Sequence, residues 1–362
     1  MSEQTVESKT PPLASEIRLD DKNIEIKTSN YPDETCEPIQ WVAAYCRERC
    51  ARQLSVLVSK CKSLKFDTDY SYWHKIFSGK YFQKDAQGKV QGSVKNLLRI
   101  IEALRNRERI EWRAGKPPFI ETDTWFLVRD FIDKKRLPGR VNKFGGIVGP
   151  TGSQKSACLK EYVLRNNHGK CVHVEAPQTP ALSQFISDLA VKLGEARSTN
   201  INRKVGYITS TINETKTIIV DNVQRLYKDN RDGDQPIFNF LQKLQDDTEC
   251  TIILSFTPVF VTTLERGQDQ GYFEQFIGRM GGRNKTLVLP AYTTTEDLEI
   301  IAKAYGLKDN AANVKYLEKI AREPGRIRAL FEDLQDAKIL ADAENTVLTI
   351  DHIREARGEE EQ

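Results

Sequence analysis

The stretch Gly149-Pro-Thr-Gly-Ser-Gln-Lys155-Ser156 decides the fold of this chain of 362 residues. It follows the apolar run Phe144–Val148 and precedes a helical pattern over Lys155–Leu164. A glycine-rich turn between a strand and a helix, ending in Lys-Ser, is the pattern of a phosphate-binding loop, or P-loop. The backbone N–H groups of such a loop and of the helix start bind phosphate oxygens, and the lysine adds a positive charge. The sequence therefore predicts a nucleotide site at this turn.

We expect the whole loop to contact the nucleotide, and Ser156 to offer its hydroxyl to Mg²⁺. The residues are Gly149, Pro150, Thr151, Gly152, Ser153, Gln154, Lys155 and Ser156. Gln154 departs from the pattern, because glycine normally precedes the lysine and lets the backbone approach phosphate closely. The alternative interpretation is a glycine-rich turn with an incidental lysine.

A second apolar run, Thr217–Val220, ends in Asp221 and Asn222. A carboxylate at the end of a buried strand is the usual partner of a P-loop, because it positions Mg²⁺ and its waters. In proteins that hydrolyse the nucleotide, the next residue is usually glutamate, whereas an amide can orient a water but cannot accept its proton. Together, Gln154 and Asn222 predict a protein that binds ATP with Mg²⁺ but hydrolyses it weakly, if at all.

Three more polar positions are candidates for contact with the γ-phosphate. Thr257 comes directly after an apolar strand, and a plain turn residue is the alternative. Arg279 ends the sequence Phe-Ile-Gly-Arg and either reaches the nucleotide of a neighbouring subunit or is a surface cation. Arg326 and Arg328 compete for the role of an arginine that folds back onto the phosphates, for which we choose Arg328; a solvated helix start is the alternative.

Composition excludes several classes of protein. Hydrophobic residues make up 39% and charged residues 29% of the chain, which supports folded cores and excludes a fibrous protein. The apolar runs are too short to span a bilayer, and the first ten residues lack the basic and apolar parts of a secretory signal. Seven cysteines without a CxxC pair and four scattered histidines predict reduced thiols rather than zinc or disulfides, and therefore a cytoplasmic protein.

Charge and periodicity divide the chain into parts. Residues 1–36 carry 4 Lys and Arg against 8 Asp and Glu and predict a flexible acidic leader, whereas residues 37–113 carry 16 against 8 and show several short helical patterns. We expect a small all-helical domain over 37–113, a P-loop core over 114–290 with a parallel sheet, a helical lid over 291–357 and a tail over 358–362. The basic helical domain indicates a polyanion partner.

The order of P-loop, strand with terminal aspartate, polar strand tip, arginine and Gly-x-x-Arg resembles that of the AAA+ ATPases. Phe119-Ile-Glu-Thr122, Val172-His-Val-Glu-Ala-Pro177 and Val220–Leu226 are similar, more narrowly, to the Mu B and TnsC-type family of transposition proteins. The resemblance covers roughly residues 117–340. It implies an α/β AAA+ core with a C-terminal lid, and ATP-dependent assembly into rings or filaments on double-stranded DNA, where the protein selects a target and stimulates a transposase. Under this resemblance, Asp221, Thr257 and Arg328 act on the nucleotide within one subunit, and Arg279 acts in the next.

The N-terminal helical domain extends the resemblance, since Ser71–Tyr81 looks like the recognition helix and following turn of a repressor-type helix-turn-helix. A helix in the major groove would present some side chains to bases and others to phosphates. The expected DNA-binding residues are Tyr70, His74 and Lys75 for bases and Lys60, Lys62, Lys65, Lys80 and Lys84 for phosphates. A helical protein-docking domain with solvated lysines is the alternative.

These features favour an AAA+ protein that assembles on DNA and regulates transposition or a related mobile-element process. Two other functions remain open. One is a scaffold that holds nucleotide without hydrolysing it and recruits a protein partner through its helical domain. The other is a signalling NTPase of the apoptotic or antiphage kind, although such chains usually carry a long repeat array after the lid.

Overall fold

The structure is a computed structural model that describes residues 16–19, 22–25, 31–83, 92–114, 118–140, 142–195, 199–228, 235–266, 270–282 and 285–359. The chain divides into two compact units. Unit 1 contains residues 1–114 and 193–198, and unit 2 contains residues 115–192 and 199–362. Most of the expected leader and residues 360–362 of the expected tail lie outside the described residues.

Unit 1 is built around four helices, as the helical periodicity predicts. They are α1 (Asp33–Arg49), α2 (Leu54–Ser63), α3 (Tyr70–Phe77) and α4 (Val94–Arg113). All four contribute to one apolar core, in which the side chains of Trp73 and Phe77 from α3 are fully buried. Unit 1 also contains a short antiparallel pair, β1 (Glu16–Leu19) and β2 (Lys22–Glu25), inside the segment expected to be a leader.

Capping residues explain where two of these helices begin. The side chain of Asp69 accepts a hydrogen bond from the N–H of Tyr72, so Asp69 caps α3. The side chain of Ser93 accepts a hydrogen bond from the N–H of Asn96, so α4 begins at Val94. Periodicity finds the body of a helix, whereas a single hydrogen bond selects its first residue.

Unit 2 contains the predicted parallel sheet. Its strands are β3 (Phe144–Val148), β4 (Cys171–Glu175), β5 (Thr217–Asp221), β6 (Thr251–Phe256) and β7 (Leu287–Val288). The strand order is β4-β5-β6-β3-β7, and every neighbouring pair is parallel. The chain therefore leaves β3, which lies between β6 and the edge strand β7, and crosses to the opposite edge at β4, a switch of direction at which α/β proteins bind ligands.

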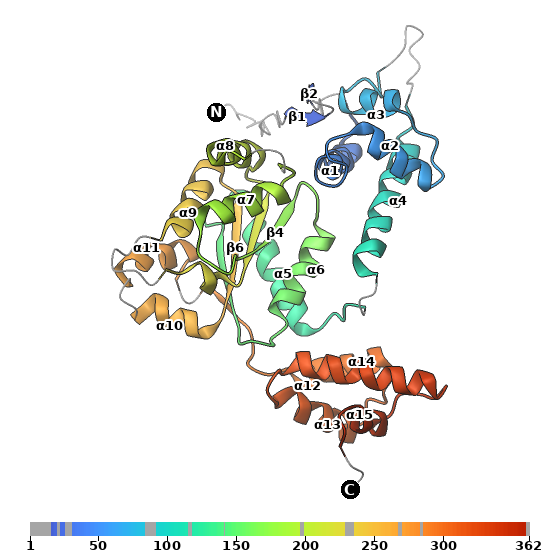
Figure 1. Cartoon of the computed structure of the whole chain (residues 1–362), viewed down its shortest axis with the longest axis vertical. Coiled ribbons are helices and arrows are strands. Elements are labelled where there is room, and N and C mark those ends of the chain that lie inside the picture. Colours follow the sequence, from blue (N-terminus) through green and yellow to red (C-terminus); the bar gives the residue numbers. More distant parts are fainter. Residues whose placement is uncertain are drawn as a thin grey trace, which may run out of the picture. The chain divides into compact units, whose positions relative to one another are not determined.

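Helices cover both faces of this sheet (Figure 1). On one face lie α5 (Asp123–Arg136) and α6 (Lys155–Arg165), whose apolar side chains form a core with β3, β5 and β6. On the other lie α7 (Leu182–Lys192), α8 (Ile201–Thr211) and α9 (Pro236–Thr248). Phe238 of α9 contacts phenylalanines of α10 (Pro258–Arg266) and α11 (Gln270–Met280). The sequence analysis did not identify α5, α8, α10 or α11.

Four helices follow the sheet and form the expected lid. They are α12 (Thr295–Tyr305), α13 (Ala311–Arg322), α14 (Ile327–Ala343) and α15 (Ile350–Ala356), which share one apolar core. The buried carboxylate of Asp297 in α12 accepts hydrogen bonds from the Asp123 N–H at 2.5 Å and the Thr124 hydroxyl at 3.2 Å. These bonds join the lid to the start of α5, where unpaired N–H groups favour a carboxylate. None of the helices described is both long and apolar enough to cross a membrane.

Candidate nucleotide site

The P-loop connects β3 to α6, as predicted, and its lysine is buried. Lys155 Nζ donates hydrogen bonds to the carbonyl oxygens of Gly149 at 2.5 Å and Pro150 at 2.8 Å. Burial lowers the pKa of Lys155 to about 8; the nearby Asp221 opposes this shift and Arg326 adds to it. The ammonium group is therefore held inside the loop, beside the N–H groups at the start of α6.

Gln154 adopts the backbone conformation that a glycine would normally supply. Its φ of 63° and ψ of 2° lie in the left-handed region, immediately before the first residue of α6. The backbone of a residue other than glycine is strained in that region. The loop therefore keeps the geometry of a P-loop despite the departure at Gln154, and the added side chain lies where α6 begins.

Asp221 is the buried carboxylate of the site, at the end of β5. Burial by itself raises the pKa of Asp221, but interactions with His173, Ser156 and Ser255 lower it to about 2. His173 Nε2 lies 3.9 Å from Asp221 Oδ2, which is too long for a hydrogen bond. The carboxylate is thus ionised at neutral pH and contacts the hydroxyl of Ser156 at the start of α6.

Asn222 also has a positive φ, of 58°, and its backbone N–H donates to Asp221 Oδ1 at 2.9 Å. Its side-chain Nδ2 lies 3.4 Å from Oε1 of Glu175, a residue that the sequence analysis did not select. Glu175 Oε1 also accepts a hydrogen bond from Arg225 Nη1 at 3.1 Å. The position that usually carries a glutamate therefore holds an amide, but a carboxylate from the neighbouring strand contacts that amide.

Ser255 in β6, and not Thr257 after the strand, interacts with Asp221. Ser255 is fully buried, and its hydroxyl interacts with the Asp221 carboxylate without a close hydrogen bond among the described residues. Thr257 follows the strand and is half-buried, and its carbonyl accepts the Phe260 N–H at the start of α10. The sequence feature that could have identified Ser255 is a serine inside the otherwise apolar end of the strand Thr251–Phe256.

Of the two lid arginines, Arg326 lies at the P-loop. A β-carbon added to Gly152 would come within 2.6 Å of the Gly325 carbonyl oxygen and 3.1 Å of Arg326 Cβ. Gly152 also has a φ of 80°, which a residue with a side chain rarely adopts. Position 152 therefore needs a glycine both for the space beside Gly325 and for its backbone conformation. Arg328, the residue chosen from the sequence, is exposed on α14.

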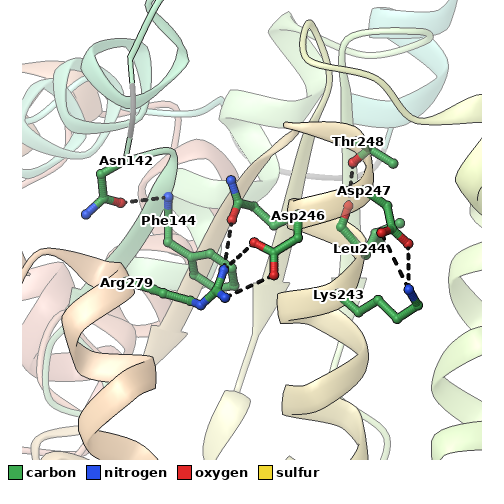
Figure 2. Close-up of polar contacts among 9 residues, drawn as sticks. Asn142, Phe144, Lys243, Leu244, Asp246, Asp247, Thr248 and Arg279 are labelled. Carbon is green, nitrogen blue, oxygen red and sulfur yellow. Dashed lines mark hydrogen bonds and ion pairs between the residues drawn. The ribbon is translucent and has the colours of Figure 1, made fainter.

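Arg279 forms an ion pair within its own chain (Figure 2). From the last turn of α11, its Nη1 and Nη2 reach Oδ1 and Oδ2 of Asp246 on α9, at 2.5 and 2.9 Å. The Arg279 side chain is 37% exposed and that of Asp246 is 51% exposed. Because the pair is at the surface, Arg279 is accessible to another molecule.

These residues fit a magnesium nucleotide. Ser156 and Asp221 supply the oxygen ligands that Mg²⁺ prefers, and the carboxylate is ionised at neutral pH. The left-handed Gln154 and the close packing at Gly152 preserve a loop whose N–H groups and Lys155 suit phosphate. When bound, Mg²⁺ would neutralise phosphate charge at these two oxygen ligands. Among the described residues, no group of three or more His, Cys, Asp or Glu side chains forms another metal site.

In unit 1, the expected DNA-binding residues lie on α2, on α3 and in the segments that follow these helices. Lys62, Lys65, Tyr70, Lys75 and Lys80 are exposed, whereas Lys60 and His74 are half-buried. The rings of Tyr70 and His74 stack with centroids 6.2 Å apart, and Lys60 Nζ lies 5.5 Å from the centre of the Tyr45 ring. Lys84 lies outside the described residues.

Comparison with known proteins gives two family matches in unit 2. Residues 140–264 match a family described as an AAA domain, and residues 283–359 match one described as the C-terminal part of the Mu B transposition protein. The first match contains the P-loop and Asp221, and the second contains the four lid helices.

Two curated relatives also match. The chain is 21% identical over 248 residues to the ATP-dependent target DNA activator B of Escherichia phage Mu, and 21% identical over 246 residues to that of Escherichia phage D108. Each match covers 66% of this chain and 72% of the relative. Among solved structures, the Orc1 protein of Aeropyrum pernix in complex with DNA has 17% identity and a TM-score of 0.48, with 69% of both chains covered.

Proposed function

The chain belongs to the AAA+ proteins that resemble transposition protein B of phage Mu, and on that premise we propose that it binds ATP with Mg²⁺, assembles on double-stranded DNA and regulates DNA transposition. One observation carries the proposal: a match to an AAA domain that contains the phosphate loop is followed, in the same chain, by a match to the C-terminal part of the Mu B transposition protein. The proposal includes a cytoplasmic location and a transposase or related recombination protein as partner.

Within this function, the nucleotide acts at the junction of core and lid. Lys155 and the N–H groups at the start of α6 bind phosphate, and Ser156 and Asp221 hold Mg²⁺. Arg326 lies against Gly152, so an occupied loop draws the lid arginine toward added negative charge. We infer that ATP in this way sets the angle between lid and core, and with it the surface available to a neighbouring subunit.

DNA binding is assigned to unit 1. The exposed lysines on and after α2 and α3 contact phosphates, and Tyr70 and His74 lie one helical turn apart on α3, where they can reach base edges. Homo-oligomers form head to tail, with Arg279 of one subunit at the nucleotide of the next, a geometry that gives rings or helical filaments. Hydrolysis is slow, because Asn222 cannot accept a proton from water.

The experiment is sedimentation velocity of a labelled DNA duplex with the protein at moderate salt, with ATP and Mg²⁺, with ADP and without nucleotide. We expect a large DNA-bound oligomer with ATP and small complexes otherwise, and loss of the large species in Lys155→Ala. Lys303→Ala, which changes an exposed lysine of the lid, is the matched control. Equal sedimentation in all three nucleotide states contradicts the proposal.

A second function is favoured by Asn222: a scaffold that holds ATP permanently and recruits a protein partner. ATP would then raise the melting temperature by mass action without releasing phosphate. Phosphate release that depends on Asp221 excludes this scaffold.

A further inference from the structure

Glu175 occupies a defined place beside the magnesium carboxylate. It is the last residue of β4 and pairs with Asp221, the last residue of β5, and the Ala176 N–H donates to the Asp221 carbonyl oxygen at 2.9 Å. Paired residues of neighbouring strands project from the same face of a sheet. His173, two residues earlier on β4, is on that face as well, since its ring lies beside the Asp221 carboxylate. Glu175 therefore projects toward the face that carries the P-loop helix.

Two side chains hold the Glu175 carboxylate at this edge. Asn222 Nδ2 lies 3.4 Å and Arg225 Nη1 lies 3.1 Å from Glu175 Oε1. The positive φ of Asn222 turns the chain after β5, and the short 3₁₀ helix Val223–Leu226 that follows carries Arg225. The Glu175 side chain is 52% exposed, so one carboxylate edge contacts the amide and the guanidinium while water has access to the group.

We propose that Glu175 is the catalytic base of this chain: Glu175 on β4 accepts the proton, and Asn222 on β5 orients the water. The inference rests on the proposed function, because it requires ATP and Mg²⁺ at Lys155, Ser156 and Asp221. The site then has a base although Asn222 cannot accept a proton, and hydrolysis is slow but occurs.

In the proposed step, Glu175 accepts one proton from a water that Asn222 orients, while the water oxygen forms a bond to the γ-phosphorus. The bond from that phosphorus to the β,γ-bridging oxygen breaks, and its electron pair stays on ADP. The products are ADP and phosphate, and the half-exposed carboxylate returns the proton to solvent. Arg225 is a positioning residue, because it contacts Glu175 and not the water.

The test compares the full-length protein with Glu175→Gln, which keeps the size of the side chain but cannot accept a proton. We expect phosphate release in the presence of DNA to fall by at least about 100-fold, the usual contribution of a general base. The affinity for ATP with Mg²⁺, measured by calorimetry, should stay within about threefold or increase, and the DNA-bound oligomer should survive longer after ATP is diluted. Glu318→Gln, at another partly exposed carboxylate paired with an arginine, is the control and should change neither phosphate release nor the affinity for ATP.

An exchange variant separates a catalytic from a structural role. Asn222→Glu combined with Glu175→Asn places the carboxylate on β5 and should recover phosphate release that Glu175→Gln lacks. If Glu175→Gln releases phosphate at the wild-type rate, the inference is overturned. A wild-type protein that assembles on DNA with ATP yet releases no phosphate also overturns it and leaves the proposed function standing, whereas a protein that binds no ATP overturns both.

Discussion

Thr122 Oγ1 donates a hydrogen bond of 3.3 Å to Oε1 of Gln154, and so joins the left-handed residue of the P-loop to the N-cap of α5. The same hydroxyl accepts the Trp125 N–H that caps α5. The side chain that strains the loop is thus also fixed by a neighbouring helix, which explains how glutamine is accommodated at a position suited to glycine.

The first prediction concerns this position. Gln154→Ala loses the hydrogen bond and keeps a strained backbone, whereas Gln154→Gly loses the bond and relieves the strain. Because the left-handed region costs a non-glycine residue roughly 1–2 kcal/mol, the glycine variant should be more stable than the alanine variant by about 1 kcal/mol. Urea unfolding measures the difference, and equal stability of the two variants contradicts it. We also expect Gln154→Gly to bind ATP more tightly than wild type.

The second prediction concerns the pH dependence of nucleotide binding. Only the protonated Lys155 attracts phosphate, and burial places its pKa near 8 in the free protein. Affinity for ATP should therefore be nearly constant below about pH 7 and fall as the pH rises through 8 to 9. Calorimetry at pH 8 in two buffers of different ionisation enthalpy should show proton uptake on binding. A flat affinity from pH 7 to 9 contradicts this role of Lys155.

The third prediction concerns acid stability. The pKa of Asp221 is lowered from its ordinary value to about 2, so the unfolded chain binds this proton more readily than the folded one. Asp221 therefore adds stability above about pH 4 that is lost as the pH falls from 4 to 2, of the order of 2 kcal/mol. Asp221→Asn should lower the free energy of unfolding by about this amount at pH 7 and by much less at pH 2.5. A difference that does not depend on pH contradicts the assignment.

The fourth prediction tests Arg279 in a neighbouring subunit. Arg279→Ala removes the arginine but keeps the nucleotide site, and Lys155→Ala removes the site but keeps the arginine. If Arg279 acts between subunits, each variant alone should be inactive in phosphate release, and a mixture of the two should recover part of the wild-type rate. Asp246→Asn, which frees Arg279 from its ion pair, should not lower the rate. A mixture as inactive as its components contradicts the head-to-tail arrangement.

The fifth prediction concerns DNA binding by unit 1. Each lysine that contacts a phosphate contributes about one unit to the slope of log K against log salt. Lys62→Gln, Lys75→Gln and Lys80→Gln should each reduce that slope by about one, and Lys303→Gln should leave it unchanged. Fluorescence anisotropy of a labelled duplex across a salt series measures the slope. Unaltered slopes in all three variants favour protein docking by the helical domain.

Much of the fold could be predicted because local pattern and tertiary role agree. Phe144–Val148 is a continuous apolar run followed by a glycine-rich turn, and only a buried strand before a P-loop satisfies both features. Helix α11 has no comparable local sequence pattern. Its phenylalanines pack against Phe238 of α9, and that contact depends on residues distant in the sequence. The sequence Phe-Ile-Gly-Arg was enough to select Arg279 as a candidate, but it could not predict the ion pair of Arg279 with Asp246.

The parts of the site that sequence missed depend on which strands are neighbours. Glu175 becomes relevant only because β4 lies next to β5, which pairs it with Asp221. Ser255 lies inside the apolar run of β6 and Thr257 follows it, and only the pairing of β6 with β5 shows that Ser255 lies next to Asp221. Sequence alone does not distinguish Arg326 from Arg328, because either residue at a helix start can face the core. The packing of Gly325 and Arg326 against Gly152 places Arg326 beside the P-loop.

The measurement that tests the central claim most directly is calorimetric titration of ATP with Mg²⁺ into the protein, beside Lys155→Ala. The account predicts saturable binding of one nucleotide per chain that requires Mg²⁺ and is lost in Lys155→Ala. Absence of binding by the wild-type protein, or binding that is equal in the two proteins, would contradict a nucleotide site at residues 149–156.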